Sequence, residues 1–222
     1  MNRNRAVIVE LVGPAGAGKT TLARGASETD SSIKSGLSLW GLPKRRLLSS
    51  AIALLPTILR ATLKRSRLTA SETAQMIRLG ALRQVVAEEA QRHRVIILDE
   101  GPVFALSWLD VFFARNRDHA TWRRRVIAQW ARLLDVVVFI DASDITLAHR
   151  IRTREKPHMV KALSDAEIFG FSDGFRRAFE RAIGELAQAG PLVVDTLRTD
   201  TGPPDENTAN LMARLKLRRN GH

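Results

Sequence analysis

The chain has 222 residues, of which 45% are hydrophobic and 26% are charged, a balance typical of a globular protein with a substantial buried core. It contains no cysteine, which excludes a disulfide framework and any zinc cluster held by cysteine. The formal net charge of +12 suits a nucleic acid, an anionic membrane surface or an acidic substrate as partner, and it equally suits a basic surface that only meets solvent.

Short apolar segments alternate along the chain with longer amphipathic ones. Runs typical of buried strands occur at residues 6–12, 31–40, 95–98, 136–140 and 192–194, of which 31–40 is the weakest. Helical patterns occupy residues 71–94, 121–134 and 164–189, and a last helix follows a loop near the C-terminus. Strands that alternate with helices form parallel sheets, so we predict one α/β domain over residues 1–222, a three-layer α/β/α sandwich around a five-stranded parallel sheet. The first residues, "MNRNR", do not resemble a signal peptide, and we expect a cytoplasmic protein.

The segment "VGPAGAGKTT" at residues 12–21 follows the first predicted strand and opens a helix. It fits the pattern G-x-x-x-x-G-K-[ST], in which glycines let successive backbone N–H groups point at phosphate oxygens beside a helix N-terminus. Lys19 can reach the β- and γ-phosphates, and the Thr20 hydroxyl can bind Mg²⁺. We therefore predict a nucleoside triphosphate site. Its expected binding residues are Gly13, Pro14, Ala15, Gly16, Ala17, Gly18, Lys19, Thr20 and Thr21.

An apolar segment at residues 41–67 has basic residues at both ends. It is too short, and too interrupted by Pro56, to span a bilayer. Three interpretations remain open: a helix that lies on a membrane interface, a helix that covers the acceptor pocket, or an ordinary part of the core.

The segment "VIILDEGP" at residues 95–102 ends a predicted strand with two acids. A carboxylate at the carboxyl end of a parallel strand beside the glycine loop faces the nucleotide and can hold Mg²⁺ directly or through water. We assign this metal-binding role, with Thr20, to Asp99. Glu100 could orient a water molecule, polarise an acceptor hydroxyl, or only meet solvent.

The segment after the fourth predicted strand carries several basic residues. Arg150 and Arg154 are four residues apart and share a helix face. A basic cover over roughly residues 149–162 could close on the triphosphate and stabilise the phosphoryl group in transfer. We therefore predict a helical basic lid in which these two arginines are catalytic and Arg150 also binds the nucleotide.

The order of "GPAGAGKTT", "VIILDEGP", "FIDASDITLAHRIRTREK" and "PLVVDT" resembles that of the P-loop nucleoside and nucleotide kinases, with thymidylate kinases and deoxynucleoside kinases as the relatives that can be named. The resemblance spans nearly the whole chain, and only the glycine loop is a specific motif. It implies that Arg83 contacts the acceptor and that the loop beside the base begins at Asp195 and Thr196. Those families have an arginine where this chain has Glu100, and an acid after the second strand, where "LSLWGLPK" has none.

These residues predict a phosphotransferase that uses ATP and Mg²⁺ to phosphorylate a small-molecule hydroxyl or phosphate acceptor. The departures indicate an acceptor other than an ordinary nucleoside or nucleotide, with a sugar, an antibiotic or a lipid-linked group all open. The alternative is a P-loop ATPase or a regulatory ATP-binding protein that acts on nucleic acid or on a membrane surface. Nucleic acid is not the favoured partner, peripheral membrane contact through residues 41–67 is possible, and the sequence does not indicate an oligomeric state.

Overall fold

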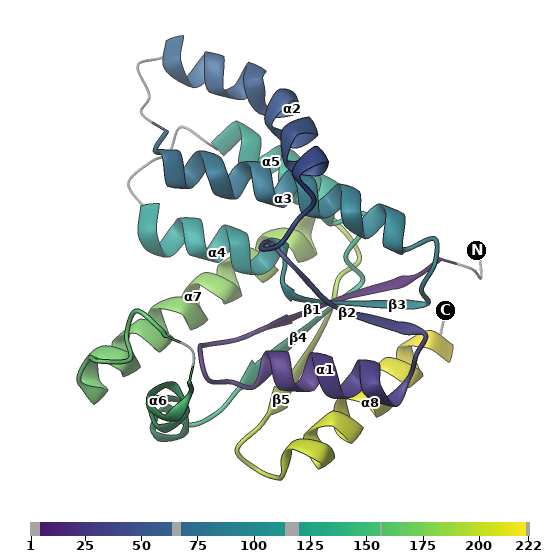
Figure 1. Cartoon of the computed structure of the whole chain (residues 1–222), viewed down its shortest axis with the longest axis vertical. Helices are drawn as coiled ribbons and strands as arrows, with labels where there is room; N and C mark the ends of the chain where they lie inside the picture. The colour runs from purple at the N-terminus through teal and green to yellow at the C-terminus, as the bar shows by residue number, and fades with distance from the viewer. Residues whose placement is uncertain (1–4, 64–67, 114–119, 156, 221–222) are drawn as a thin grey trace.

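The protein is built around one five-stranded parallel sheet. The computed structural model describes residues 5–63, 68–113, 120–155 and 157–220. The strand order is β2-β3-β1-β4-β5, so the strand before the glycine loop lies at the centre (Figure 1). The strands are β1 (Val7–Val12), β2 (Ile33–Ser38), β3 (Val95–Glu100), β4 (Val136–Asp141) and β5 (Val193–Arg198). The predicted five-stranded parallel sheet is therefore confirmed.

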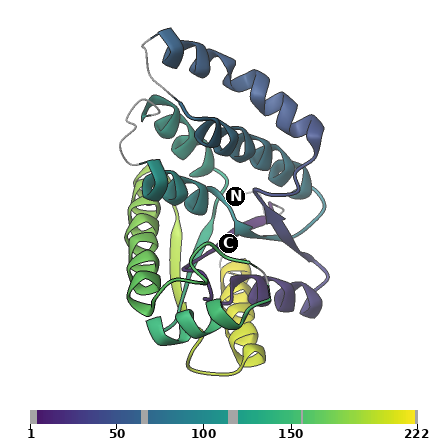
Figure 2. The same cartoon turned by 60° about the vertical axis from the view of Figure 1, so that its left-hand side comes forward.

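Helices cover both faces of the sheet, as Figures 1 and 2 show. They are α1 (Lys19–Thr29), α2 (Lys44–Leu63), α3 (Ala70–Glu89), α4 (Pro102–Phe113), α5 (Ala120–Trp130), α6 (Asp144–Thr153), α7 (Asp165–Ala189) and α8 (Pro204–Asn220). One apolar core joins α1 and α8 to one face, and another joins α3, α4, α5 and α7 to the other. The result is the three-layer arrangement that the alternating pattern predicts.

The central strand β1 illustrates how its sequence supplies both cores. Successive side chains of a strand point to opposite faces. Val9 and Leu11 accordingly enter the core beside α1 and α8, whereas Ile8 and Val12 enter the core beside α3, α4 and α7. Glu10 shares the face of Ile8 and Val12 and is fully buried. One charged residue therefore lies at the centre of an otherwise apolar strand.

Several element boundaries differ from those predicted. The helix expected over residues 71–94 ends at Glu89, and β5 extends to Arg198 instead of ending near Val194. The helix α4 was not predicted, because its apolar residues give little helical amphipathicity. Thr69 begins α3 with a capping box, a local signal that the sequence does contain.

The helix α2 forms the outer edge of the molecule and packs against α3 (Figures 1 and 2). Leu54 is buried on its inner side, and the Ser50 hydroxyl donates a hydrogen bond to the Ile77 carbonyl at 2.7 Å. Within the described residues no helix is both long and apolar enough to cross a bilayer. The residues 64–67, which end the predicted apolar and basic segment, lie outside that description.

A phosphate loop beside two carboxylates and an aromatic cavity

The glycine loop lies between β1 and α1, at the carboxyl end of the sheet. Gly16 and Gly18 have φ values of 83° and 90°, a backbone region that L side chains rarely adopt. At Gly13 the constraint is a close approach, since a Cβ atom would lie 1.9 Å from the carbonyl oxygen of Ile140. The loop is thus held against β4, and its curl requires glycine at these positions.

The ammonium group of Lys19 folds back over the loop that precedes it. Its Nζ donates hydrogen bonds to the carbonyl oxygens of Gly13 at 2.7 Å and Pro14 at 3.0 Å. Burial lowers the pKa of Lys19, and the negative charges of Asp99 and Glu100 oppose that shift. A cation held in this way stands beside the loop amides where phosphate oxygens would bind.

Asp99 and Thr20 form the candidate metal site. The Thr20 hydroxyl donates a hydrogen bond of 2.6 Å to Oδ2 of Asp99, whereas the buried Oδ1 of Asp99 accepts none from any described residue. A hydroxyl and a carboxylate oxygen are ligands that Mg²⁺ prefers, and Mg²⁺ completes its shell with water and phosphate oxygens. Accordingly, no group of three or more potential metal-ligating acids or histidines occurs in the described ranges. The donor set fits a magnesium ion that is held mainly by nucleotide phosphates.

Glu100 follows Asp99 and is the last residue of β3. Its side chain accepts a hydrogen bond from Trp40, and its buried Oε2 has no partner among the described residues. Burial, followed by the nearby charge of Asp99, raises the pKa of Glu100. The guanidinium of Arg78 lies over the Trp40 ring, 4.1 Å from its centroid. Trp40, itself covered by Arg78, therefore binds the Glu100 carboxylate, whose Oε2 is left without a partner among the described residues.

Glu10 is a site-supporting residue that the sequence analysis missed. Its Oε1 accepts hydrogen bonds from the backbone N–H groups of Gly101 and Phe104, each at 3.0 Å, and its Oε2 accepts one from Val103 at 2.9 Å. The carboxyl group thus caps the start of α4 and fixes the turn directly after Glu100. Burial raises the pKa of Glu10 to about 7, and the three hydrogen bonds limit that rise. The available signal was an acid within the apolar run "VIVELV".

The lid arginines occupy different places. Arg150 donates to the Gly16 carbonyl at 3.3 Å, to the Thr199 hydroxyl at 2.9 Å and to the Thr199 carbonyl at 2.9 Å. Arg154, at the C-terminal end of α6, lines the cavity together with His158, and its charge contributes to the lowered pKa values of Lys19 and His158. Both arginines therefore face the glycine loop, as predicted, although α6 ends at Thr153 and the predicted lid is helical only up to that residue.

The loop after β5, which the resemblance places beside a nucleotide base, begins later than predicted. Thr196 is exposed within β5 and does not line the cavity, because the strand extends to Arg198. The lining residue is Thr199, whose hydroxyl donates to the Ala17 carbonyl at 3.0 Å. Asn207 on α8 also lines this end and donates hydrogen bonds to the carbonyls of Thr199 and Gly202. The structure thus places Thr199, and not Thr196, against the glycine loop and in the lining of the cavity.

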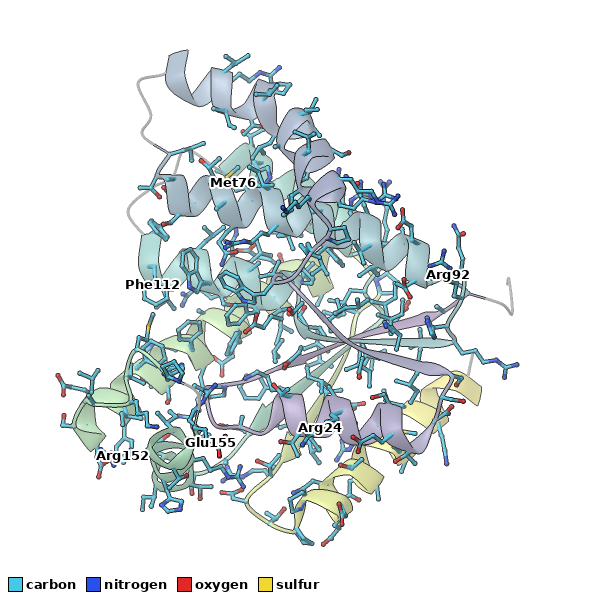
Figure 3. All side chains as sticks on the ribbon, in the orientation of Figure 1. Arg24, Met76, Arg92, Phe112, Arg152 and Glu155 are labelled. Carbon is cyan, nitrogen blue, oxygen red and sulfur yellow. The ribbon has the colours of Figure 1, made fainter. Side chains whose placement is uncertain are left out.

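A cavity of about 590 Å³ joins the glycine loop to an aromatic wall. Two helices supply that wall with aromatic residues spaced by four: Phe104, Trp108 and Phe112 on α4, and Phe171, Phe175 and Phe179 on α7. Figure 3 shows Phe112 near the outer end of α4, and its ring lies 6.1 Å from that of Phe175. Arg83 lies on α3 and does not line this cavity, so its predicted contact with the acceptor has no support in the geometry.

Comparison with known proteins identifies the fold. No family model and no curated protein sequence matches the chain. It is similar to deoxyadenosine kinase from M. mycoides with products dCMP and a flexible dCDP bound, at a TM-score of 0.58 and 16% identity over 95% of this chain and 99% of that one. It is also similar to the YorR protein of Bacillus subtilis in complex with phosphorylated GDP, at a TM-score of 0.53 and 16% identity over 97% and 99% of the two chains.

Shikimate kinase from Bacteroides thetaiotaomicron is a further structural neighbour, at a TM-score of 0.50 and 17% identity over 95% of this chain and 98% of that one. The fold is therefore that of the P-loop kinases, and the resemblance predicted from the motifs is confirmed at the level of the fold. At these identities the likeness does not name the acceptor.

Proposed function

We propose that the protein is a phosphotransferase that moves the γ-phosphoryl group of ATP, bound with Mg²⁺, to a hydroxyl group of a small acceptor. The observation that carries this proposal is the pair of adjacent carboxylates at the end of β3. Asp99 accepts a hydrogen bond from Thr20, which follows the phosphate loop, and both carboxylates line the cavity, each with one buried oxygen that has no partner among the described residues. One acid thus serves the metal and the other serves the acceptor.

Each residue of the site would have a separate role in phosphoryl transfer. Lys19 and the loop amides would bind the β- and γ-phosphates, and Thr20 with Asp99 would hold Mg²⁺, which neutralises phosphate charge when bound. The acceptor oxygen would attack the γ-phosphorus in line, the bond from that phosphorus to the β–γ bridging oxygen would break, and ADP would leave. Glu100 would take the acceptor hydroxyl proton, a role favoured by its raised pKa. Arg154 would stabilise charge on the group in transfer.

The acceptor is proposed to have a substantial apolar body. Away from the glycine loop the cavity is lined mainly by the aromatic wall, together with Glu100, Arg154 and His158. In this chain Glu100 stands where the related kinases have an arginine, which disfavours an anionic acceptor at this end. An acceptor with a flat ring could stack on these aromatic side chains, and an aliphatic acceptor could pack against them. Its hydroxyl group would reach Glu100.

The test is transfer of labelled γ-phosphoryl from ATP to a panel of alcohols that differ in apolar area. Lys19→Ala should lower transfer by at least about a hundredfold, and Glu100→Gln should lower kcat by about a hundredfold while ATP binding is retained. Glu28→Gln on the exposed face of α1 is the matched control and should behave as wild type. Phe112→Ser should raise KM for the acceptor without raising KM for ATP. Equal transfer by wild type and Lys19→Ala would refute the proposal.

A further inference from the structure

The outer face of α2 is apolar although it faces solvent. Leu48, Ile52, Leu55 and Leu59 are 64%, 58%, 49% and 61% exposed, respectively. Their spacing of four, three and four residues places them on one side of the helix, within about one sixth of its circumference at 100° per residue. The side that faces α3 carries Ser50 and Leu54. The inner side also carries Leu47 and Ile58, so the helix packs one aliphatic face against the core and presents a second one outward.

This apolar stripe, defined as Leu48, Ile52, Leu55 and Leu59, is continuous and projects from the molecule. From Leu48 to Leu59 it is about 16 Å long at 1.5 Å per residue. Figures 1 and 2 both show α2 as the outermost element on its side, away from the sheet. The structure contains other exposed aliphatic side chains, such as Ile145 and Val194, but these lie on separate elements. Scattered exposed residues are ordinary, whereas a contiguous apolar face marks an interaction site.

The charges of α2 indicate which kind of partner would bind the apolar stripe. The helix contains no acidic residue, and its basic residues lie toward its ends. Lys44 and Arg45 are exposed at its start, next to the stripe in helical projection, and Arg60 is exposed near its end. Arg46 is turned to the inner side, where it pairs with Glu88 of α3, and Arg45, whose side chain is 76% exposed, lies 3.9 Å from the same carboxylate. In the sequence, residues 64–67 add Lys64, Arg65 and Arg67, although these four residues lie outside the described ranges.

We propose that the α2 stripe docks on an anionic membrane surface, with the aliphatic side chains at the boundary of the acyl region and Lys44, Arg45 and Arg60 at lipid phosphates. A helix with this division of apolar and basic groups lies in the plane of a membrane interface. Because α2 is basic toward both ends, a second copy of the chain would place like charges together in either antiparallel or parallel pairing. Charge complementarity therefore favours anionic lipid over self-association.

The test is flotation of the full chain with vesicles of phosphatidylcholine alone or mixed with phosphatidylglycerol. Wild type should float with the anionic vesicles, less at high salt, and should not float with phosphatidylcholine alone. Leu48→Ser/Leu59→Ser should lower the partition coefficient by at least about tenfold. Ile145→Ser/Val194→Ser removes two exposed aliphatic side chains elsewhere and should leave binding unchanged.

A second pair of variants separates local charge from net charge. Lys44→Glu should lower the partition coefficient by roughly tenfold, whereas Arg125→Glu, the same reversal at an exposed position of α5, should change it little. No binding of wild type to anionic vesicles would overturn the proposal, as would equal binding by the stripe variant. A wild-type dimer that Leu48→Ser/Leu59→Ser dissociates, without vesicle binding by either, would overturn it in favour of a second copy.

Discussion

Replacement of Glu10 by glutamine tests whether this buried carboxyl group makes the stability of the protein depend on pH. Glu10 is fully buried, and burial raises the pKa of its carboxyl group from 4.5 to about 7. Between these two values the folded state binds a proton that the unfolded state releases. The stability that this group contributes is therefore full below pH 4.5 and is lost as the pH rises through about 7. The glutamine side chain does not titrate, so Glu10→Gln removes this dependence.

The size of the effect follows from the separation of the two pKa values. A difference of about 2.5 corresponds to about 3 kcal/mol at 1.36 kcal/mol per pKa unit. The free energy of unfolding of wild type, minus that of Glu10→Gln, should thus fall by about 3 kcal/mol between pH 4 and pH 8. Urea denaturation of both proteins across this range measures the difference, in which the titration of groups that do not interact with Glu10 cancels; Glu100 does interact with it. A difference independent of pH would refute a raised pKa at Glu10.

A second variant at this position separates the charge from the cap. Glu10→Leu leaves the backbone N–H groups of Gly101, Val103 and Phe104 without their acceptor. Each buried donor without a partner costs about 1–3 kcal/mol, so Glu10→Leu should be destabilised by about 3 kcal/mol or more at every pH relative to Glu10→Gln, which keeps one carbonyl oxygen. Equal stability of the two variants would show that Glu10 does not cap α4.

Two further predictions concern the glycine loop and the lid. Gly13→Ala should lower the free energy of unfolding by about 2–4 kcal/mol because the new Cβ meets the Ile140 carbonyl. Gly170→Ala, in open space on α7, should raise the free energy of unfolding by up to about 1 kcal/mol. Thermal denaturation measures both changes, and a shift of the two variants in the same direction would contradict this prediction. Arg150→Ala should weaken nucleotide binding and lower kcat because Arg150 joins Gly16 to Thr199, while Arg152→Ala, whose guanidinium pairs with Asp165, should do neither. Steady-state kinetics in which the two arginine variants are equivalent would refute the proposed difference.

The sequence predicted the parts of the fold that depend on local pattern. The β-branched runs and the glycine loop were sufficient for the parallel sheet. Thr20 and Asp99 lie 79 residues apart but meet at 2.6 Å, as expected for a loop and a strand end at the same edge of a sheet. The placement of Arg150 and Arg154 near the loop followed from the basic segment after the fourth predicted strand, and the resemblance of motif order agreed with it.

The sequence did not predict features that depend on long-range packing. Thr199 reaches Ala17 across 182 residues, and the length of β5, which decides this contact, depends on pairing with β4 and not on its own pattern. The aromatic wall was missed because residues spaced by four on α4 and α7 read as ordinary core until the two helices are brought together. Arg83 was selected by alignment with other kinases, and the helix places Arg78, not Arg83, beside Trp40.

The most direct test of the proposed function is phosphorus NMR of a reaction that contains ATP, Mg²⁺ and one apolar alcohol from the acceptor panel. Wild type should convert the γ-phosphate signal into that of a phosphate monoester of the alcohol, together with ADP, and Lys19→Ala should give neither. Formation of inorganic phosphate alone, at one rate whichever alcohol is present, would contradict phosphoryl transfer and would identify an ATPase.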